Sequence, residues 1–289
     1  MFKTKERRSG GRALKGRLVY ALALLSVALS LLSLVVILGD ALADGLPYLT
    51  WGFITSFPSR FPSRAGILPA LVGSVWLVAL TALFSFPLGV CAAIYLEEYA
   101  PRNRVTEFIQ VNIANLAGVP SIVYGLLGLG LFVDALALGR SVLAGALTMT
   151  LLILPVIIIA SREALRSVPK IYREGAFALG ATRWEVTRQI VLPEALPGIL
   201  TGTIIALSRA IGEAAPMIAI AALVYVTFVP LSPLDRFTVL PIQIYNWVNL
   251  PRTEFRNLAA AGIILLLVVL VAMNSVAITI RYRHQRKAV

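Results

Sequence analysis

The chain has 289 residues, of which 58% are hydrophobic and only 14% are charged, and its mean hydropathy is +0.86. Soluble domains carry about 25% charged residues, so this composition excludes an ordinary soluble protein, and such high hydrophobicity excludes a disordered chain. The single cysteine, Cys91, excludes an internal disulfide, and with the single histidine, His284, it cannot form a four-ligand zinc site.

Six apolar stretches follow one another along the chain, and each is long enough to cross a bilayer, which takes about 20 apolar residues in a helix. They are residues 18–38, 69–96, 108–133, 141–160, 197–226 and 258–280. The sequence therefore predicts an all-α, polytopic membrane protein with six transmembrane helices. A cleaved signal peptide is the competing interpretation of residues 1–38, but the first apolar run exceeds the roughly 7–15 residues of a signal-peptide core.

Basic residues orient the predicted helices. Of the 26 Lys and Arg residues, 19 lie on one side of the membrane and six on the other. The 19 lie in residues 1–17, 97–107, 161–196 and 281–289. The positive-inside rule therefore predicts that both termini are cytoplasmic. The net charge of +12 is then a topology signal, so we expect membrane lipid and no nucleic acid as a binding partner.

The third predicted span is interrupted by Gly118-Val119-Pro120-Ser121. Small residues at such a position allow close helix packing, which is the simpler interpretation. A broken helix at membrane depth can also present backbone groups to a substrate. Ser121 and Tyr124 are therefore candidate residues of a substrate path.

The predicted cytoplasmic loop, residues 161–196, begins with the pattern of a short helix. Pro169 can start this helix, because proline in the first turn loses only an unpaired donor. Helix-forming residues then run to Leu179, and Gly180 can adopt the left-handed conformation that ends a helix.

A second short helix, about 183–192, is predicted to follow and to end at Pro193. Thr182 and Glu185 match a capping box at its start. The pattern is thus helix, glycine corner, helix, outside the membrane. Patterning alone leaves open a plain connector that lies on the surface.

The fifth predicted span contains two charges, Arg209 and Glu213, which share one helix face. An arginine at the bilayer centre costs about 2.5–3.5 kcal/mol on insertion scales. Pro216 removes the donor to the carbonyl of Gly212 and loosens the helix beside the pair. The pair could be a buried ion pair that only fixes packing, or a polar station on a transport path, where the planar fork of arginine suits an oxyanion.

The loop resembles the EAA loop of ABC importer permeases, with its pattern E-A-A, three residues, G, nine residues, I-x-L-P. The matching residues are Glu174, Gly175, Ala176, Gly180, Ile190, Leu192 and Pro193. The departure is Gly175, where the family usually has alanine. The resemblance implies a coupling helix that docks on an ATP-binding subunit, with Glu174, Ala176 and Gly180 at the interface. The chain lacks G-x-x-x-x-G-K-[ST], so ATP has to be bound by a partner.

Further stretches resemble the PstA-type permease subunits of phosphate ABC importers. They are residues 115–132, 161–169, 174–185, 208–217, 237–247 and 259–278. The resemblance implies a type I ABC importer permease fold and a non-catalytic subunit that transports inorganic phosphate by alternating access. Ala214 departs from the family, which commonly has threonine there, so a hydroxyl beside Glu213 is missing.

The resemblance also implies the location and the partners. The location is the bacterial inner membrane. The partners are a second, PstC-like permease subunit, two PstB-like ATP-binding subunits and an extracytoplasmic PstS-like phosphate-binding protein. No cofactor or metal is expected on this chain.

We divide the chain into four segments. They are a basic N-terminal segment at 1–17, a first helix with its outer loop at 18–68, a permease core at 69–280 and a cytoplasmic tail at 281–289.

Three other functions compete with phosphate import. The same fold could carry another oxyanion, such as phosphonate or sulfate. The chain could instead be a membrane scaffold or sensor of phosphate status. An intramembrane enzyme is disfavoured, because His284 lies in the tail and the aspartates lie in loops, so a Ser/His or paired-aspartate site cannot be built within a span.

Overall fold

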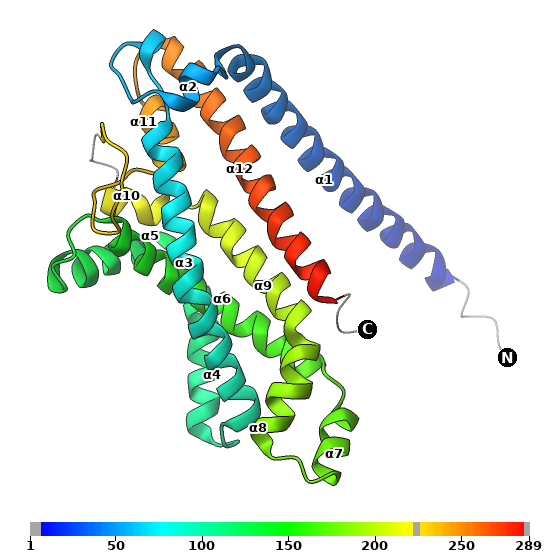
Figure 1. Ribbon diagram of the computed structural model, residues 1–289. Helices are drawn as coiled ribbons and strands as arrows, with labels where there is room; N and C mark the ends of the chain where they lie inside the picture. The colour runs from blue at the N-terminus through cyan, green and yellow to red at the C-terminus, as the bar shows by residue number, and fades with distance from the viewer. Residues whose placement is uncertain (1–6, 222–225, 286–289) are drawn as a thin grey trace.

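The computed structural model describes residues 7–221 and 226–285, and this part of the chain is built of helices (Figure 1). The longer helices are α1 (Arg7–Gly45), α3 (Leu68–Ile94), α4 (Arg104–Ala117), α6 (Val142–Ser167), α9 (Leu192–Gly212) and α12 (Thr253–Gln285). The shorter ones are α2 (Trp51–Thr55), α5 (Ser121–Gly128), α7 (Lys170–Ala178), α8 (Arg183–Val186), α10 (Ala215–Ala221) and α11 (Leu240–Val248). No strand occurs within the described ranges, so the predicted all-α class is confirmed.

Three π-helical segments extend helices α3, α5 and α8. They are Tyr95–Tyr99, Leu129–Ala135 and Thr187–Val191. Parts of three predicted segments lie outside the described residues. These parts are residues 1–6 of the N-terminal segment, 222–225 of the fifth span and 286–289 of the tail.

Within the described residues, five helical stretches are long and apolar enough to cross a membrane, and a bent pair raises the count to six. The bent pair is the third predicted span, in which 104–117 and 121–135 meet at 101°. Pro120 lacks a backbone donor and disfavours the helical conformation of the residue before it, which explains the break. The six predicted crossings and the interruption at 118–121 thus agree with the helices, and the third crossing is sharply bent.

The helices observed around the fifth span differ from the predicted ones at both ends. The helix predicted to end at Pro193 continues, because helical structure runs from Arg183 to Gly212. A π-helical segment precedes Pro193, which then lies in the first turn of α9, where a missing donor is tolerated. The predicted loosening of the helix beside Pro216 is a complete break, because α9 stops at Gly212 and a new helix, α10, begins at Ala215.

Helices α3, α6 and α9 form the centre of the bundle, and α6 packs most extensively against α3 (Figure 1). A central apolar cluster joins them to α5 and α10; it includes Leu77, Met149, Ala206, Tyr124 and Met217. A second cluster lies where α2 and α11 meet α12, and a third lies where α7 and α8 meet the ends of α3, α6 and α9. These two clusters are at opposite ends of the bundle in Figure 1.

Helix α1 contrasts with this centre. It meets α12 near Gly45, where a Cβ atom would come within 2.6 Å of the Ala260 backbone. None of its most apolar 18-residue stretch is buried against the rest of the described chain. Figure 1 shows α1 diverging from α12 toward its N-terminal end. Its leucine and valine side chains therefore face the surroundings of the bundle, as expected of a helix that lies in lipid.

Candidate functional site

The loop that follows α6 folds as the sequence predicts, into two helices that meet at a glycine corner. Gly180 has a φ of +85°, the left-handed conformation that ends α7. At the start of α8, the Glu185 backbone N–H donates to Thr182 Oγ1, and Glu185 Oε2 accepts from the Thr182 backbone N–H at 2.7 Å. The capping box is therefore present and holds the corner in one geometry.

The outer surface of this loop carries large apolar side chains. Leu179 is 90% exposed and Ile171 is 71% exposed. Further exposed apolar side chains are Tyr172, Phe177 and Trp184. Apolar side chains gathered on a loop at the end of a bundle indicate a protein–protein contact. Glu174, Gly175 and Gly180 are exposed on the same loop.

One residue of the EAA pattern faces the rest of the chain. Ala176 is only 8% exposed and belongs to the apolar cluster at this end of the bundle. It packs inward and seats α7 on the rest of the chain, and its place at a partner interface stays a prediction. Ile190 and Leu192 are partly buried against the same cluster, and Pro193 is exposed.

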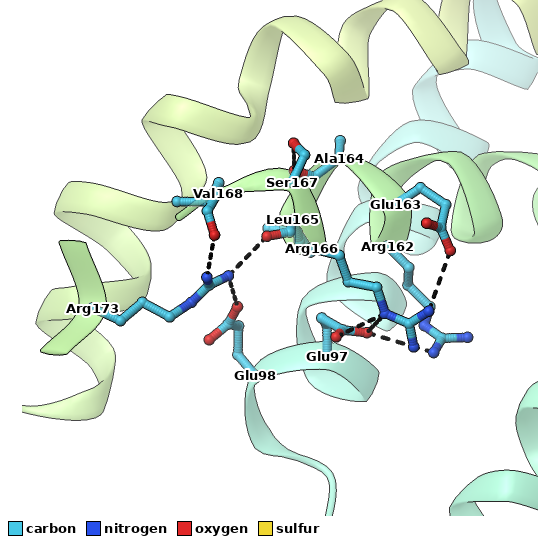
Figure 2. A network of polar contacts seen from close by, with 10 residues as sticks. All are labelled: Glu97, Glu98, Arg162, Glu163, Ala164, Leu165, Arg166, Ser167, Val168 and Arg173. Atoms are coloured by element: carbon cyan, nitrogen blue, oxygen red, sulfur yellow. Dashed lines mark hydrogen bonds and ion pairs between the residues drawn. The ribbon is translucent and has the colours of Figure 1, made fainter. Parts of the chain in front are cut away.

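An arginine that the sequence reasoning did not single out fastens α7 to the bundle (Figure 2). Arg173 Nη1 donates to the Val168 carbonyl at 2.7 Å, and Nη2 donates to the Leu165 carbonyl at 2.8 Å and to Glu98 Oε1 at 2.9 Å. The two carbonyls belong to the end of α6, and Glu98 belongs to the π-helical segment after α3. Three separate elements are therefore joined at one guanidinium group.

A second group of charges lies beside the first and joins α6 to the end of α3 (Figure 2). Glu97 Oε1 accepts from Arg166 Nε at 3.0 Å, and Glu97 Oε2 lies 3.5 Å from Arg162 Nη2. Arg166 also pairs with Glu163 at 3.3 Å. The sequence indicates this network weakly. Glu97 and Glu98 follow the predicted span 69–96, and the arginines at 162 and 166 follow the predicted span 141–160, and both spans are predicted to end on the same side of the membrane.

The predicted substrate-path charges lie at the break between α9 and α10. Arg209 Nε donates to Glu213 Oε1 at 3.1 Å, and the two side chains are 56% and 20% exposed. Glu213 follows the last residue of α9 in an extended conformation. The next residue before Arg209, Ser208, contacts Asn274 of α12 at 2.5 Å, which fixes this turn of α9. Arg209 is therefore not a buried packing residue of this chain but is open to its surroundings.

The other two candidate residues lie at the break between α4 and α5. Tyr124 is buried, and its hydroxyl donates to the Leu116 carbonyl at 2.8 Å, so it braces the bent span. Ser121 is the partly exposed first residue of α5. Helix α5 packs on α10, and a Cβ atom at Gly125 would come within 2.7 Å of the Pro216 backbone. The two broken segments are thus in direct contact.

The long apolar helices are those of a multi-pass membrane protein, and a family match gives its class. The model of the family described as binding-protein-dependent transport system inner membrane component matches residues 85–287. The chain belongs to this family and is a multi-pass membrane protein.

Several named relatives are permeases. "Phosphate transport system permease protein PstA" of Haemophilus influenzae is 32% identical over 263 residues, 91% of this chain and 92% of that protein. The probable PstA of Methanocaldococcus jannaschii is 32% identical over 254 residues, 88% of each chain. "Probable ABC transporter permease protein YqgI" of Bacillus subtilis is 39% identical over 180 residues, 62% of this chain, and the match spans 61% of YqgI.

Solved structures support the fold. The structure of a bacterial ABC transporter involved in the import of the polysaccharide alginate has a TM-score of 0.65 at 19% identity, covering 96% of this chain and 99% of that chain. The MetNI methionine ABC transporter has a TM-score of 0.60 at 17% identity, covering 73% and 93%. The architecture is therefore the type I ABC importer permease fold.

Proposed function

We propose that this chain is the permease subunit of an ATP-driven importer of inorganic phosphate and forms half of its translocation path. The observation that carries the proposal is the open Arg209–Glu213 pair at the broken end of α9, in a chain that is similar to PstA proteins along most of its length. Arginine presents parallel N–H donors to tetrahedral oxyanions, which favours phosphate. The subunit itself catalyses no reaction.

Glu213 has two roles in this mechanism. Its bond to Arg209 Nε holds the guanidinium in place before the anion arrives. Its negative charge also weakens the attraction for the anion, so that phosphate is released and not trapped. Ser121 is a further polar contact at the neighbouring break, while Tyr124 shapes the break from inside the bundle.

Coupling to ATP uses the loop of α7 and α8. Its exposed apolar side chains and Glu174 dock on a separate PstB-like ATP-binding subunit, and closure of two such subunits moves the loop. The loop moves α6 and α3, and the membrane cavity opens to one side and then to the other. A PstC-like subunit supplies the other half of the path, and a PstS-like protein delivers phosphate from outside. This scheme requires the loop and both termini to lie in the cytoplasm, as the basic residues predict.

Reconstitution of the chain with these partner subunits in proteoliposomes tests the proposal. We expect ATP-dependent uptake of radiolabelled phosphate that requires the binding protein and is competed by unlabelled phosphate. Stronger competition by phosphonate or sulfate would assign another oxyanion as cargo. A complex that assembles but takes up no anion would support a scaffold or sensor and would contradict the proposal.

A further inference from the structure

Arg173 is adjacent to Glu174 in the sequence, but its side chain points toward the helix bundle and not toward the loop surface. It is 17% exposed, and its partner Glu98 is 12% exposed. Its neighbours Tyr172 and Glu174 are exposed on the loop surface. Helix α7 thus has an exposed face for a partner and one arginine that reaches back to the bundle (Figure 2).

The three acceptors of Arg173 explain the strength of this link. The last carbonyls of a helix have no partner within it and attract a cation, and Arg173 binds the carbonyls of Leu165 and Val168 at the end of α6. Its bond to Glu98 adds an ion pair at 2.9 Å. The low exposure of both side chains limits the screening that weakens surface ion pairs.

In the apolar cluster at this end of the bundle, the buried side chain that α7 contributes is small. Ala176 contributes one methyl group to the local cluster, and the chain enters α7 through Pro169, next to Val168. A methyl group resists compression but does not resist pulling or sliding. Arg173 is therefore the side chain through which α7 can both push and pull α6 and α3.

The route from Arg173 continues to the broken helices. Helices α3 and α6 pack on each other along their length. Both contribute to the central cluster that also contains Tyr124 of α5 and Met217 of α10. A displacement of the α3–α6 pair therefore reaches the two breaks beside Arg209.

We infer that Arg173 is the positioning residue that transmits movement of the coupling helix α7 to α3 and α6. This inference deepens the proposed function and rests on its coupling step, but it does not depend on phosphate being the cargo. Loss of Arg173 should leave the ATP-binding subunit attached, because the exposed face of α7 is unchanged. It should separate ATP hydrolysis from transport.

The experiment measures uptake and ATP hydrolysis in the same proteoliposomes of the whole complex. Arg173→Met keeps the aliphatic stem and removes all donors. We expect co-purification of the ATP-binding subunit and ATP hydrolysis within about twofold of the unmodified complex, and transport per ATP hydrolysed lower by about tenfold or more, as the loss of charge-assisted hydrogen bonds predicts. Glu98→Gln should give a smaller loss, since the two carbonyl bonds remain.

Arg166→Met is the matched control. Arg166 is also at the end of α6 and also pairs with a glutamate of the same π-helical segment, Glu97, but its two ion-pair partners, Glu97 and Glu163, lie outside α7. Transport per ATP should stay within about twofold of the unmodified complex. An equal loss in this control would overturn the inference, because any charge at this end would then have the same effect.

Three further outcomes decide the inference. Unchanged coupling in Arg173→Met overturns it. Loss of the ATP-binding subunit from that variant also overturns it, because Arg173 would then only shape the docking surface. If Arg173→Met does not assemble, the nearly isosteric Glu98→Gln takes its place. Lower transport per ATP hydrolysed in that variant supports the inference, and an unchanged value overturns it.

Failure of the proposed function gives a different result. An unmodified complex that hydrolyses ATP but takes up no phosphate would contradict phosphate import. In that case, the stimulation of ATP hydrolysis by the binding protein would still test the role of Arg173. If Arg173→Met keeps basal hydrolysis but loses this stimulation, the inference is supported. If the stimulation persists in Arg173→Met, the inference is overturned.

Discussion

Two arginine–glutamate pairs in this molecule share the same chemistry but differ in where they lie. Arg173 and Glu98 lie 75 positions apart in the sequence, are 17% and 12% exposed, and join separate elements. Arg209 and Glu213 lie four positions apart, and Arg209 is 56% exposed. The distances are nearly equal, at 2.9 and 3.1 Å. The difference is therefore one of placement: the first pair joins elements that are far apart in the sequence, and the second leaves its cation exposed on the surface of this chain.

The largest effect should come from removing the accessible cation. Arg209→Ala is expected to lower phosphate uptake by at least about 100-fold, because two charge-assisted hydrogen bonds to an oxyanion contribute about 1.5–3 kcal/mol each. The complex should still assemble, as gel filtration would show. Arg209→Lys keeps the charge without the planar fork and should retain part of the uptake. Full transport by the alanine variant would remove Arg209 from the path.

A smaller effect should follow from reversing a charge on the exposed face of α7. Glu174→Lys should lower co-purification of the ATP-binding subunit by about tenfold, since a misplaced charge at an interface costs at least about 1.4 kcal/mol. Glu163→Lys is the control, because Glu163 is 66% exposed at the end of α6 and not on α7. Normal co-purification of Glu174→Lys would count against the docking face.

A methyl group between the broken helices should destabilise the molecule by about 1–3 kcal/mol, the usual cost of overpacking. Gly125→Ala places a Cβ atom within 2.7 Å of the Pro216 backbone, so α5 and α10 have to separate. Gly130→Ala is the control, because no atom lies within 4 Å of its Cβ position. The thermal aggregation midpoint of the purified complex should fall only for the first variant; equal midpoints would mean that the contact between the breaks is loose.

The smallest effect concerns the glycine corner between α7 and α8. Thr182→Ala removes the helix cap and should cost about 1 kcal/mol of local stability. Hydrogen exchange of the amides at 183–186 should become faster, while transport per ATP should change less than in Arg173→Met. Thr182→Ser retains a capping hydroxyl and should exchange as the unmodified chain does. Faster exchange in the serine variant as well would assign the effect to the methyl group.

The features predicted correctly from the sequence are those that depend on neighbouring residues. The break at Pro120, the left-handed Gly180 and the capping box of Thr182 are local, so a few adjacent residues decide them. The membrane-spanning helices are predicted for the same reason, because the hydrophobicity of each stretch is a property of its own residues.

The features missed depend on residues far apart in the chain. The bonds of Arg173 to Glu98 and to the end of α6 exist only because three elements meet, and none of them is unusual in its own stretch of sequence. The inward turn of Ala176 has the same origin. The helix through Pro193 was missed because a proline normally stops a helix, and the π-helical segment before it was not visible in the pattern.

The isolation of helix α1 has a mechanical consequence. The helical stretch 15–48 has 34 residues and would be about 51 Å long as a straight helix, but its apolar run, 18–38, would be about 32 Å long, which is close to the hydrocarbon thickness of about 30 Å. The apolar run therefore spans the layer, and the ends of the stretch, which carry Lys15, Arg17, Asp40 and Asp44, extend beyond it. Because α1 packs closely on α12 near Gly45 and diverges from it toward its N-terminal end (Figure 1), a shift of the central helices need not repack side chains against most of α1.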